Sequence, residues 1–181
     1  MAETDERITG AALTGSAAVG REDRWSDIDL AFWPAAEFGA TAPTFRLLFG
    51  TANERPPTSA PTAVGLIGMG WLYALHARSS IARGRPWQAE YMISGVRDHV
   101  MALAGLRHGV PASEGRGMDS LPADLTAGLT TALVGSLDIA ELRRAFRVAG
   151  EALLVEVGHV YAGLVNRLAG PLAMLLQTGT N

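Results

Sequence analysis

Leu13-Thr-Gly-Ser-Ala-Ala-Val-Gly-Arg-Glu-Asp-Arg-Trp-Ser-Asp-Ile-Asp-Leu-Ala-Phe32 is the stretch of this sequence that decides the fold of its N-terminal part. The run at residues 8–14 is short, apolar and bounded by charge, so it predicts a buried strand. Gly15 allows a sharp turn, and we expect Ser16 to cap a short helix. Because a helix N-terminus beside a hydroxyl group is a ready anion site, the turn predicts phosphate binding.

The second half of the stretch has the two-residue period of a strand. Ile28, Leu30 and Phe32 alternate with polar or small residues. This period places the side chains of Asp27 and Asp29 on one face of the strand, where two carboxylates repel each other unless a cation lies between them. Mg²⁺ is the expected cation, since it prefers hard oxygen ligands and completes its shell with water and phosphate oxygens.

These residues resemble the signature of the nucleotidyltransferase superfamily that includes DNA polymerase beta and the aminoglycoside nucleotidyltransferases. The signature is Gly-Ser, then about ten residues, then Asp-x-Asp on the next strand, and Gly15, Ser16, Asp27 and Asp29 match it. The resemblance implies a two-metal Mg²⁺ site and a substrate that is ATP or another nucleoside triphosphate.

The resemblance also assigns roles to single residues. It makes Asp27 and Asp29 the catalytic metal ligands, and it assigns the nucleotide to Gly15, Ser16, Arg21 and Ser26. Arg21 and the nearby Arg24 either reach phosphate oxygens or are solvated loop residues, and the sequence leaves both readings open.

The composition limits the other functional classes. The chain has 181 residues, 48% of them hydrophobic, and no uninterrupted apolar run long enough for a membrane span. A net charge of −3 argues against general nucleic-acid binding. The absence of cysteine excludes thiolate metal sites and favours a cytoplasmic location.

The order of elements predicts an α+β protein of two parts. Residues 51–62 contain three prolines among small polar residues, which is typical of a linker. We therefore expect a small nucleotidyltransferase α/β head of two to three strands at residues 1–55 and a bundle of four to five helices at residues 63–178. The expected helices are 63–83, 86–108, 122–134, and 138–168 with a capping box formed by Asp138 and Glu141 and a stop at Gly170-Pro171.

A transferase of this kind needs a general base for the proton of the acceptor hydroxyl group. Glu90 is the candidate, because it lies early in a predicted helix and has aromatic neighbours that could desolvate it. Arg97, two helical turns further on, lies on the same face. Glu90 could therefore equally form an ion pair with Arg97 that holds the bundle together.

The sequence departs from the family pattern after Asp29. Relatives carry a third carboxylate on a following strand, whereas Phe45 to Phe49, a possible third strand or helical turn, contains no acid. Glu37 and Glu54 are the only carboxylates between Asp29 and the first long helix. We interpret this as an internal deletion, which would leave sheet edge and apolar surface exposed and so predicts a homodimer.

The leading function is transfer of a nucleoside monophosphate to a hydroxyl group of a small molecule, of which an aminoglycoside-like antibiotic is one candidate, or of a protein. A protein acceptor would fit an AMP-transferring antitoxin. The non-enzymatic alternative is a degenerate nucleotidyltransferase that acts as a nucleotide-binding or protein-interaction module.

Overall fold

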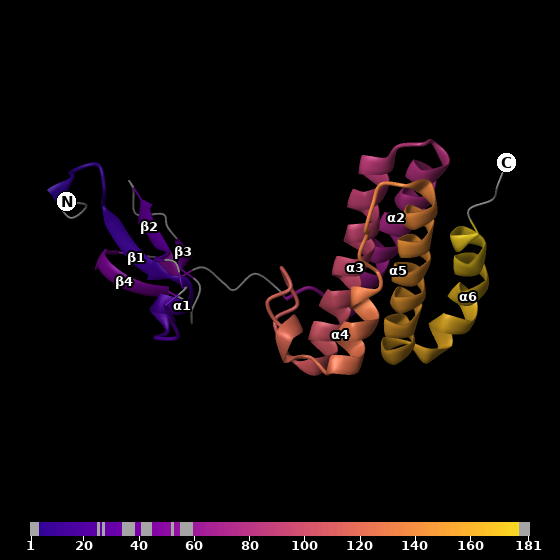
Figure 1. The fold of residues 1–181 in the computed structure, drawn as a ribbon. Coiled ribbons are helices and arrows are strands. Elements are labelled where there is room, and N and C mark those ends of the chain that lie inside the picture. Colours follow the sequence, from indigo (N-terminus) through magenta and orange to yellow (C-terminus); the bar gives the residue numbers. More distant parts are fainter. Residues whose placement is uncertain are drawn as a thin grey trace. The chain divides into compact units, whose positions relative to one another are not determined.

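The computed structural model describes residues 4–24, 26, 28–33, 39–40, 45–51, 53–54 and 60–177. The chain divides into two compact units, Met1–Ala60 and Pro61–Asn181, and the division falls within the proline-rich stretch 51–62. Strands lie in the first, which we call the sheet unit, and long helices lie in the second, which we call the helical unit (Figure 1). The protein is therefore of mixed α+β class, as the sequence predicts.

The sheet unit contains a three-stranded antiparallel sheet with the order β2-β1-β4. Its strands are β1 (Gly10–Thr14), β2 (Leu30–Trp33) and β4 (Phe45–Gly50). Strands were expected on both sides of the Gly-Ser turn, and the ambiguous stretch at residues 45–49 is the third strand. Ala11 and Ala12 of the central strand are almost fully buried. Because consecutive side chains of a strand point to opposite faces, both faces of the central strand are covered here.

Two smaller elements complete the sheet unit. A single helical turn, α1 (Gly15–Ala18), follows β1 directly. The two-residue strands β3 (Gly39–Ala40) and β5 (Asn53–Glu54) pair in parallel as a separate ladder. Gly15 has a φ of 68°, a backbone conformation that residues other than glycine adopt only with strain.

The first two helices of the helical unit have the predicted ranges to within one residue. Helix α2 (Ala63–Ala82) begins at Thr62, whose hydroxyl group accepts a hydrogen bond from the Gly65 N–H at 3.1 Å. Helix α3 (Pro86–His108) ends at Gly109, which has a φ of 68°. These boundaries agree with the expected helices because Thr62, Pro86 and Gly109 are strong local signals at the ends of a helix.

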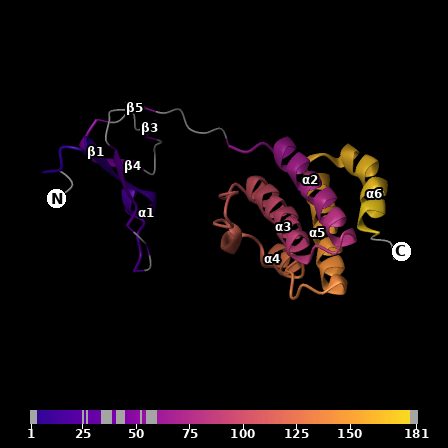
Figure 2. The same cartoon turned by 90° about the horizontal axis from the view of Figure 1, so that it is seen from above.

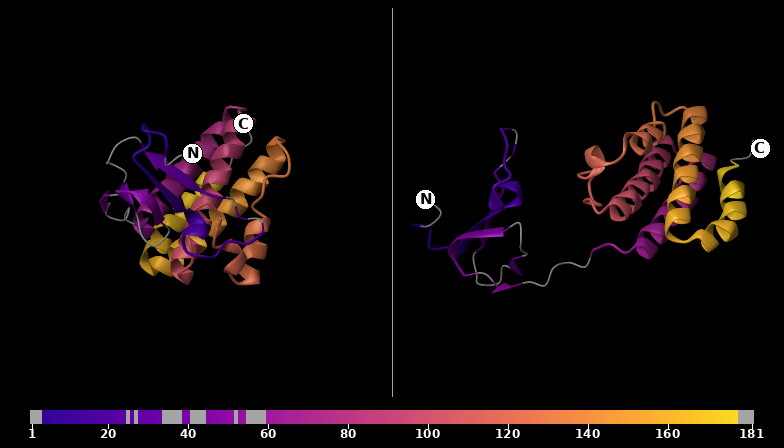
Figure 3. Two further views of the ribbon diagram at one scale, coloured as in Figure 1. Left: turned by 90° about the vertical axis from the view of Figure 1, so that its left-hand side faces the viewer. Right: turned by 90° about the horizontal axis from the view of Figure 1, so that it is seen from below.

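The later helices differ from the prediction. The last four elements are a short 3₁₀ turn, η2 (Met118–Ser120), and the helices α4 (Ala123–Thr130), α5 (Ile139–Val160) and α6 (Ala162–Leu176). The expected helix 138–168 breaks at Tyr161, where the chain reverses so that α6 lies beside α5 (Figure 3).

The expected stop at Gly170-Pro171 is also wrong, because Pro171 lies inside α6. Leu172 and Leu175, just beyond the proline, are buried in the core of the unit. Gly150 of α5 leaves the space into which Leu176 packs, since a Cβ atom there would overlap the leucine side chain. Burial of these leucines outweighs the backbone hydrogen bond that proline removes.

The core of the helical unit lies between α2, α3 and α5. Its largest fully buried side chains are Phe146, Ile93, Leu103, Leu142, Val96 and Val157. Small residues let α2 and α3 approach closely, and the ring of Tyr73 occupies the place where a Cβ atom of Gly95 would lie. Within the described ranges, none of the helices combines the length and the apolar character that crossing a membrane requires.

The predicted capping box at the start of α5 does not form. Asp138 occupies the cap position, but its side chain makes no cap hydrogen bond, and it accepts one from the Ser136 hydroxyl group at 2.8 Å instead. The Glu141 carboxylate accepts from the Gly135 N–H at 2.9 Å, a residue further upstream than the box requires.

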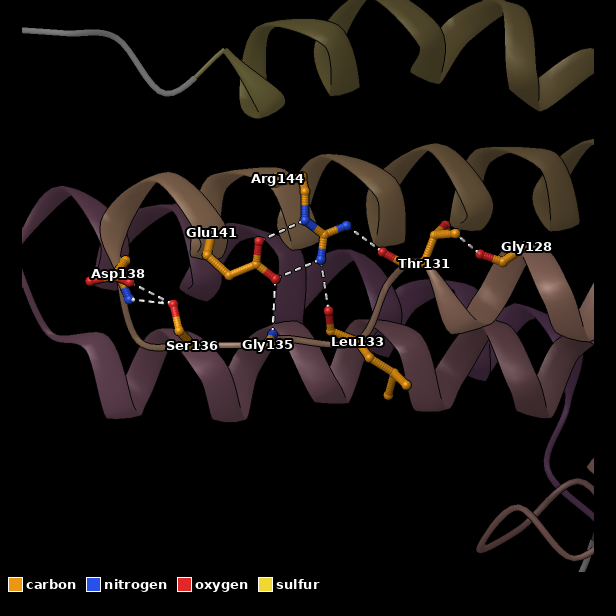
Figure 4. A network of polar contacts seen from close by, with 8 residues as sticks. All are labelled: Gly128, Thr131, Leu133, Gly135, Ser136, Asp138, Glu141 and Arg144. Carbon is orange, nitrogen blue, oxygen red and sulfur yellow. Dashed lines mark hydrogen bonds and ion pairs between the residues drawn. The ribbon is translucent and has the colours of Figure 1, made fainter.

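A different network fixes this segment (Figure 4). The Arg144 guanidinium donates to both carboxylate oxygens of Glu141, at 2.7 and 2.6 Å, and also to the main-chain carbonyls of Thr131 and Leu133. Helix α4 ends at Thr130 and not near residue 134, and the guanidinium binds two carbonyls of the segment that follows it. Hydrogen bonds from Arg144 and from the Gly135 N–H lower the pKa of Glu141 to about 2.

Candidate functional site

The Gly-Ser turn and the second half of the signature lie next to each other in the sheet unit. The N–H of Thr14 donates to the carbonyl of Asp29 at 2.8 Å, one step beyond the register in which Leu13 pairs with Leu30. A Cβ atom on Gly15 would overlap Oδ2 of Asp29. The antiparallel pairing of β1 with β2 therefore places the Asp29 carboxylate directly against the first residue of α1.

The local role of Ser16 differs from the expectation. The cap position of α1 is Thr14, whose side chain makes no cap hydrogen bond, and Ser16 is the second residue of the helical turn. The carbonyl of Ser16 accepts from the N–H groups of Val19, at 3.2 Å, and Arg21, at 3.0 Å. The serine is thus held in a tight turn by its main chain, and the prediction that it caps the helix is wrong.

Ser26, which the resemblance assigns to nucleotide binding, forms hydrogen bonds within the loop between the two halves of the signature. The Ser26 hydroxyl group accepts from the N–H of Asp23 at 2.9 Å and donates to Oδ1 of Asp23 at 3.1 Å. The N–H of Ser26 donates to the carbonyl of Asp23 at 3.1 Å. Ser26 therefore shapes the loop, while Arg21 of the same loop is exposed.

The carboxylates of the expected metal site are only partly within the described residues. Asp27 lies outside them, so its position relative to Asp29 stays a prediction. Asp29 is exposed and presents the hard oxygen donors that Mg²⁺ prefers. β4 carries no acid, and the part of the chain that the structure describes contains no group of three acidic or histidine side chains that could hold a metal ion. The carboxylate oxygens fit magnesium, and Asp29 is the one carboxylate of the expected metal site that lies within the described residues.

Glu90 lies in the early part of α3, in the helical unit. Its carboxylate accepts a hydrogen bond from the Ser94 hydroxyl group at 2.7 Å, whereas Arg97 pairs with Asp98 at 3.2 Å. Arg97 thus has a different partner from the one that the alternative reading proposed. Trp87 and Tyr91 are 76% and 62% exposed, so these aromatic residues do not enclose Glu90.

A cavity beside α3 contains two carboxylates that the sequence singles out, with Glu90, as candidates for an acidic acceptor cleft. Asp98 and Glu114 line a cavity of about 270 Å³ together with Met101 and Met118. Glu114 has a φ of 58°, which is uncommon for a residue with a side chain, and it pairs with Arg116 at 2.7 Å. Glu114 belongs to the glycine-rich loop after α3, and such loops commonly shape binding sites on a rigid scaffold.

A second cavity of about 410 Å³ shares Met101 and Met118 with the acidic one. Arg97 and Asp119 are its charged residues, and the remaining lining is mostly apolar or threonine.

Comparison of the chain with protein-family models gives no match, and comparison with curated proteins gives none either.

Proposed function

We propose that the protein is a Mg²⁺-dependent nucleotidyltransferase that moves a nucleoside monophosphate from ATP, or another nucleoside triphosphate, to a hydroxyl group. The acceptor oxygen forms a bond to the α-phosphorus. The bond from that phosphorus to the bridging oxygen breaks, and pyrophosphate leaves with the electron pair. Glu90 is the proposed acceptor for the proton of the hydroxyl group.

The observation that carries this proposal is the contact between Gly15 and Asp29. Transfer of a nucleotide requires phosphate oxygens and metal-binding carboxylates in the same place, and here a Gly-Ser turn lies against an exposed aspartate. Gly15 and Ser16 would receive the triphosphate, and Asp29 with Asp27 would hold the metal. The bound metal ion would supply neutralisation of the phosphate charge.

The cavity lined by Asp98 and Glu114 supports a cationic small molecule as the acceptor. Asp98 pairs with Arg97 and Glu114 with Arg116, so amino groups of a substrate would replace these arginines. An aminoglycoside-like molecule has several amino groups as well as reactive hydroxyls. A protein hydroxyl group, as in an AMP-transferring antitoxin, is the competing acceptor.

A second candidate function is a nucleotide-binding or protein-interaction module that has lost turnover. The acid-free sequence of β4, Phe-Arg-Leu-Leu-Phe-Gly, favours it, because the related enzymes use a third carboxylate on a strand after Asp-x-Asp. A module of this kind would bind a triphosphate through the Gly15–Ser16 turn and release no pyrophosphate.

A pyrophosphate-release screen tests the proposal. The protein is incubated with Mg²⁺ and each of ATP, GTP, CTP and UTP, with and without a panel of aminoglycosides. We expect release with one triphosphate that increases with the correct acceptor, and its loss in the double variant Asp27→Asn/Asp29→Asn. Calorimetric binding of a triphosphate without release would favour the module, and neither binding nor release would refute both functions.

A further inference from the structure

The outward side of helix α2 carries a stripe of apolar and small residues, flanked by the exposed His76 and Arg78. Val64 is 63% exposed, and Leu72 and Leu75 are each 43% exposed. These residues, together with Gly68 and Ser79, recur at spacings of three and four and therefore share one side of the helix. We call these five residues the α2 face. An apolar stripe on a helix usually packs against another element, and the described bundle leaves this stripe open.

The inner side of α2 is already fully used. Ile67, Gly70, Ala74, Ala77 and Ile81 of the helix are buried in the bundle. Figure 2 shows α2 at the margin of the helical unit, with α3 and α6 on either side of it, and α2 also contacts α5. The α2 face thus lies on the side of the helix that these partners leave open.

The α2 face is complementary to itself in size. When two copies of the helix are placed antiparallel about a two-fold axis beside Leu72, Leu75 of one copy lies opposite Gly68 of the other. The same operation places Val64 opposite Ser79. A Cβ atom on Gly68 would meet no atom within 4 Å, so the space above it is open to a leucine from outside. Leu75 and Val64 therefore each meet a small residue, in contacts that occur twice, and Leu72 lies beside its own copy at the axis.

The chemistry of the face also favours a second copy over a charged partner. The five residues of the α2 face carry no charge. Pairing of two such faces along about 22 Å of helix therefore removes apolar surface from water without desolvating one of these side chains as a charge. A groove beside Val64, lined by Tyr161, Leu164 and Arg167, lies toward the junction of α5 and α6 and adds one cation at the edge of the α2 face. We propose that the chain forms a homodimer through antiparallel packing of the α2 face. This goes beyond the proposed function, since it holds whether or not the protein is an enzyme.

Cross-linking tests the interface in the full chain. The sequence contains no cysteine, so one introduced thiol is the only one present. We expect Leu72→Cys, beside the axis, to form an intermolecular disulfide under mild oxidation. Val64→Cys, on the same face but at its end, should not pair with its own copy, because the two thiols would lie about 22 Å apart along the helix. Equal cross-linking of both variants indicates parallel packing and would overturn the proposal.

Sedimentation equilibrium supplies the second measurement. The unmodified chain should dimerise with rising concentration, and Leu72→Glu/Leu75→Glu should raise the dimer dissociation constant at least about tenfold. Val155→Glu is the matched control, since Val155 is an exposed valine of α5 and not part of the α2 face. The proposal is overturned if the double variant dimerises as tightly as the unmodified chain. It is also overturned if the chain stays monomeric at high concentration and Leu72→Cys does not cross-link.

Discussion

Oδ2 of Asp29 occupies the position that a side chain on Gly15 would need. Two independent constraints therefore require glycine at residue 15. Its φ of 68° strains any other residue, and the contact with the carboxylate excludes even a methyl group. The contact joins the two halves of the Gly-Ser and Asp-x-Asp pattern.

Gly15→Ala should therefore displace the Asp29 carboxylate. Because misplacement of a reacting group by about 1 Å can reduce a rate about 100-fold, we expect a loss of that order in triphosphate turnover. The matched control is Gly20→Ala: Gly20 has a φ of 66°, yet a Cβ atom there would meet nothing within 4 Å. Both variants carry backbone strain of about 1–2 kcal/mol. Equal loss of turnover in both would show that strain alone is responsible.

The ion pair between Arg107 and Glu156 gives a prediction about stability. Glu156 is almost fully buried, and the guanidinium donates to both of its carboxylate oxygens, at 3.2 and 2.8 Å. This hydrogen bonding raises the pKa of Arg107. Arg107→Met would leave a buried carboxylate without its cation, so we expect a loss of about 3 kcal/mol in the free energy of unfolding.

The double variant Arg107→Met/Glu156→Met should recover most of that loss, because two apolar side chains replace the pair. Urea unfolding of the single and double variants measures both values. If the double variant were as unstable as Arg107→Met, the loss would not come from the unpaired carboxylate of Glu156, and the prediction would be wrong.

The Glu141–Arg144 pair predicts a dependence of stability on pH. The pKa of Glu141 in the folded protein is about 2, against an ordinary value of 4.5. Between these values the unfolded chain binds the proton first, so the stabilisation is complete above pH 4.5 and is lost as the pH falls toward 2. Thermal unfolding from pH 6 to pH 2 should thus show a steeper acid loss for the natural chain than for Glu141→Gln. Parallel curves would contradict the assignment.

The helices that the sequence predicts best are those with strong signals at both ends. Thr62, Pro86 and Gly109 act through their own backbone and capping chemistry, so the bounds of α2 and α3 follow from local sequence. Pro171 is also a strong local signal, and it misleads. The burial of Leu172 and Leu175 against residues of other helices keeps α6 helical, and no local pattern contains that information.

The candidate site shows the same division. The approach of Gly15 to Asp29 was predictable, because a strand, a tight turn and a second strand form one antiparallel pair. The choice of side-chain partners was not: Ser26 bonds to Asp23, and Arg97 bonds to Asp98 instead of Glu90. These choices depend on small differences in loop shape and rotamer. For the same reason Arg144 replaced the expected capping box.

Glu90 supplies the last prediction. Replacement by glutamine keeps an acceptor for the Ser94 hydroxyl group, which lies 2.7 Å from the carboxylate, and removes only the ability to take a proton. If Glu90 is the base, kcat should fall at least about 100-fold with little change in KM for the triphosphate. Ser94→Ala is the control, since it removes the hydrogen bond and keeps the carboxylate. An unchanged kcat in Glu90→Gln would assign the proton to another group and leave Glu90 as a structural partner of Ser94.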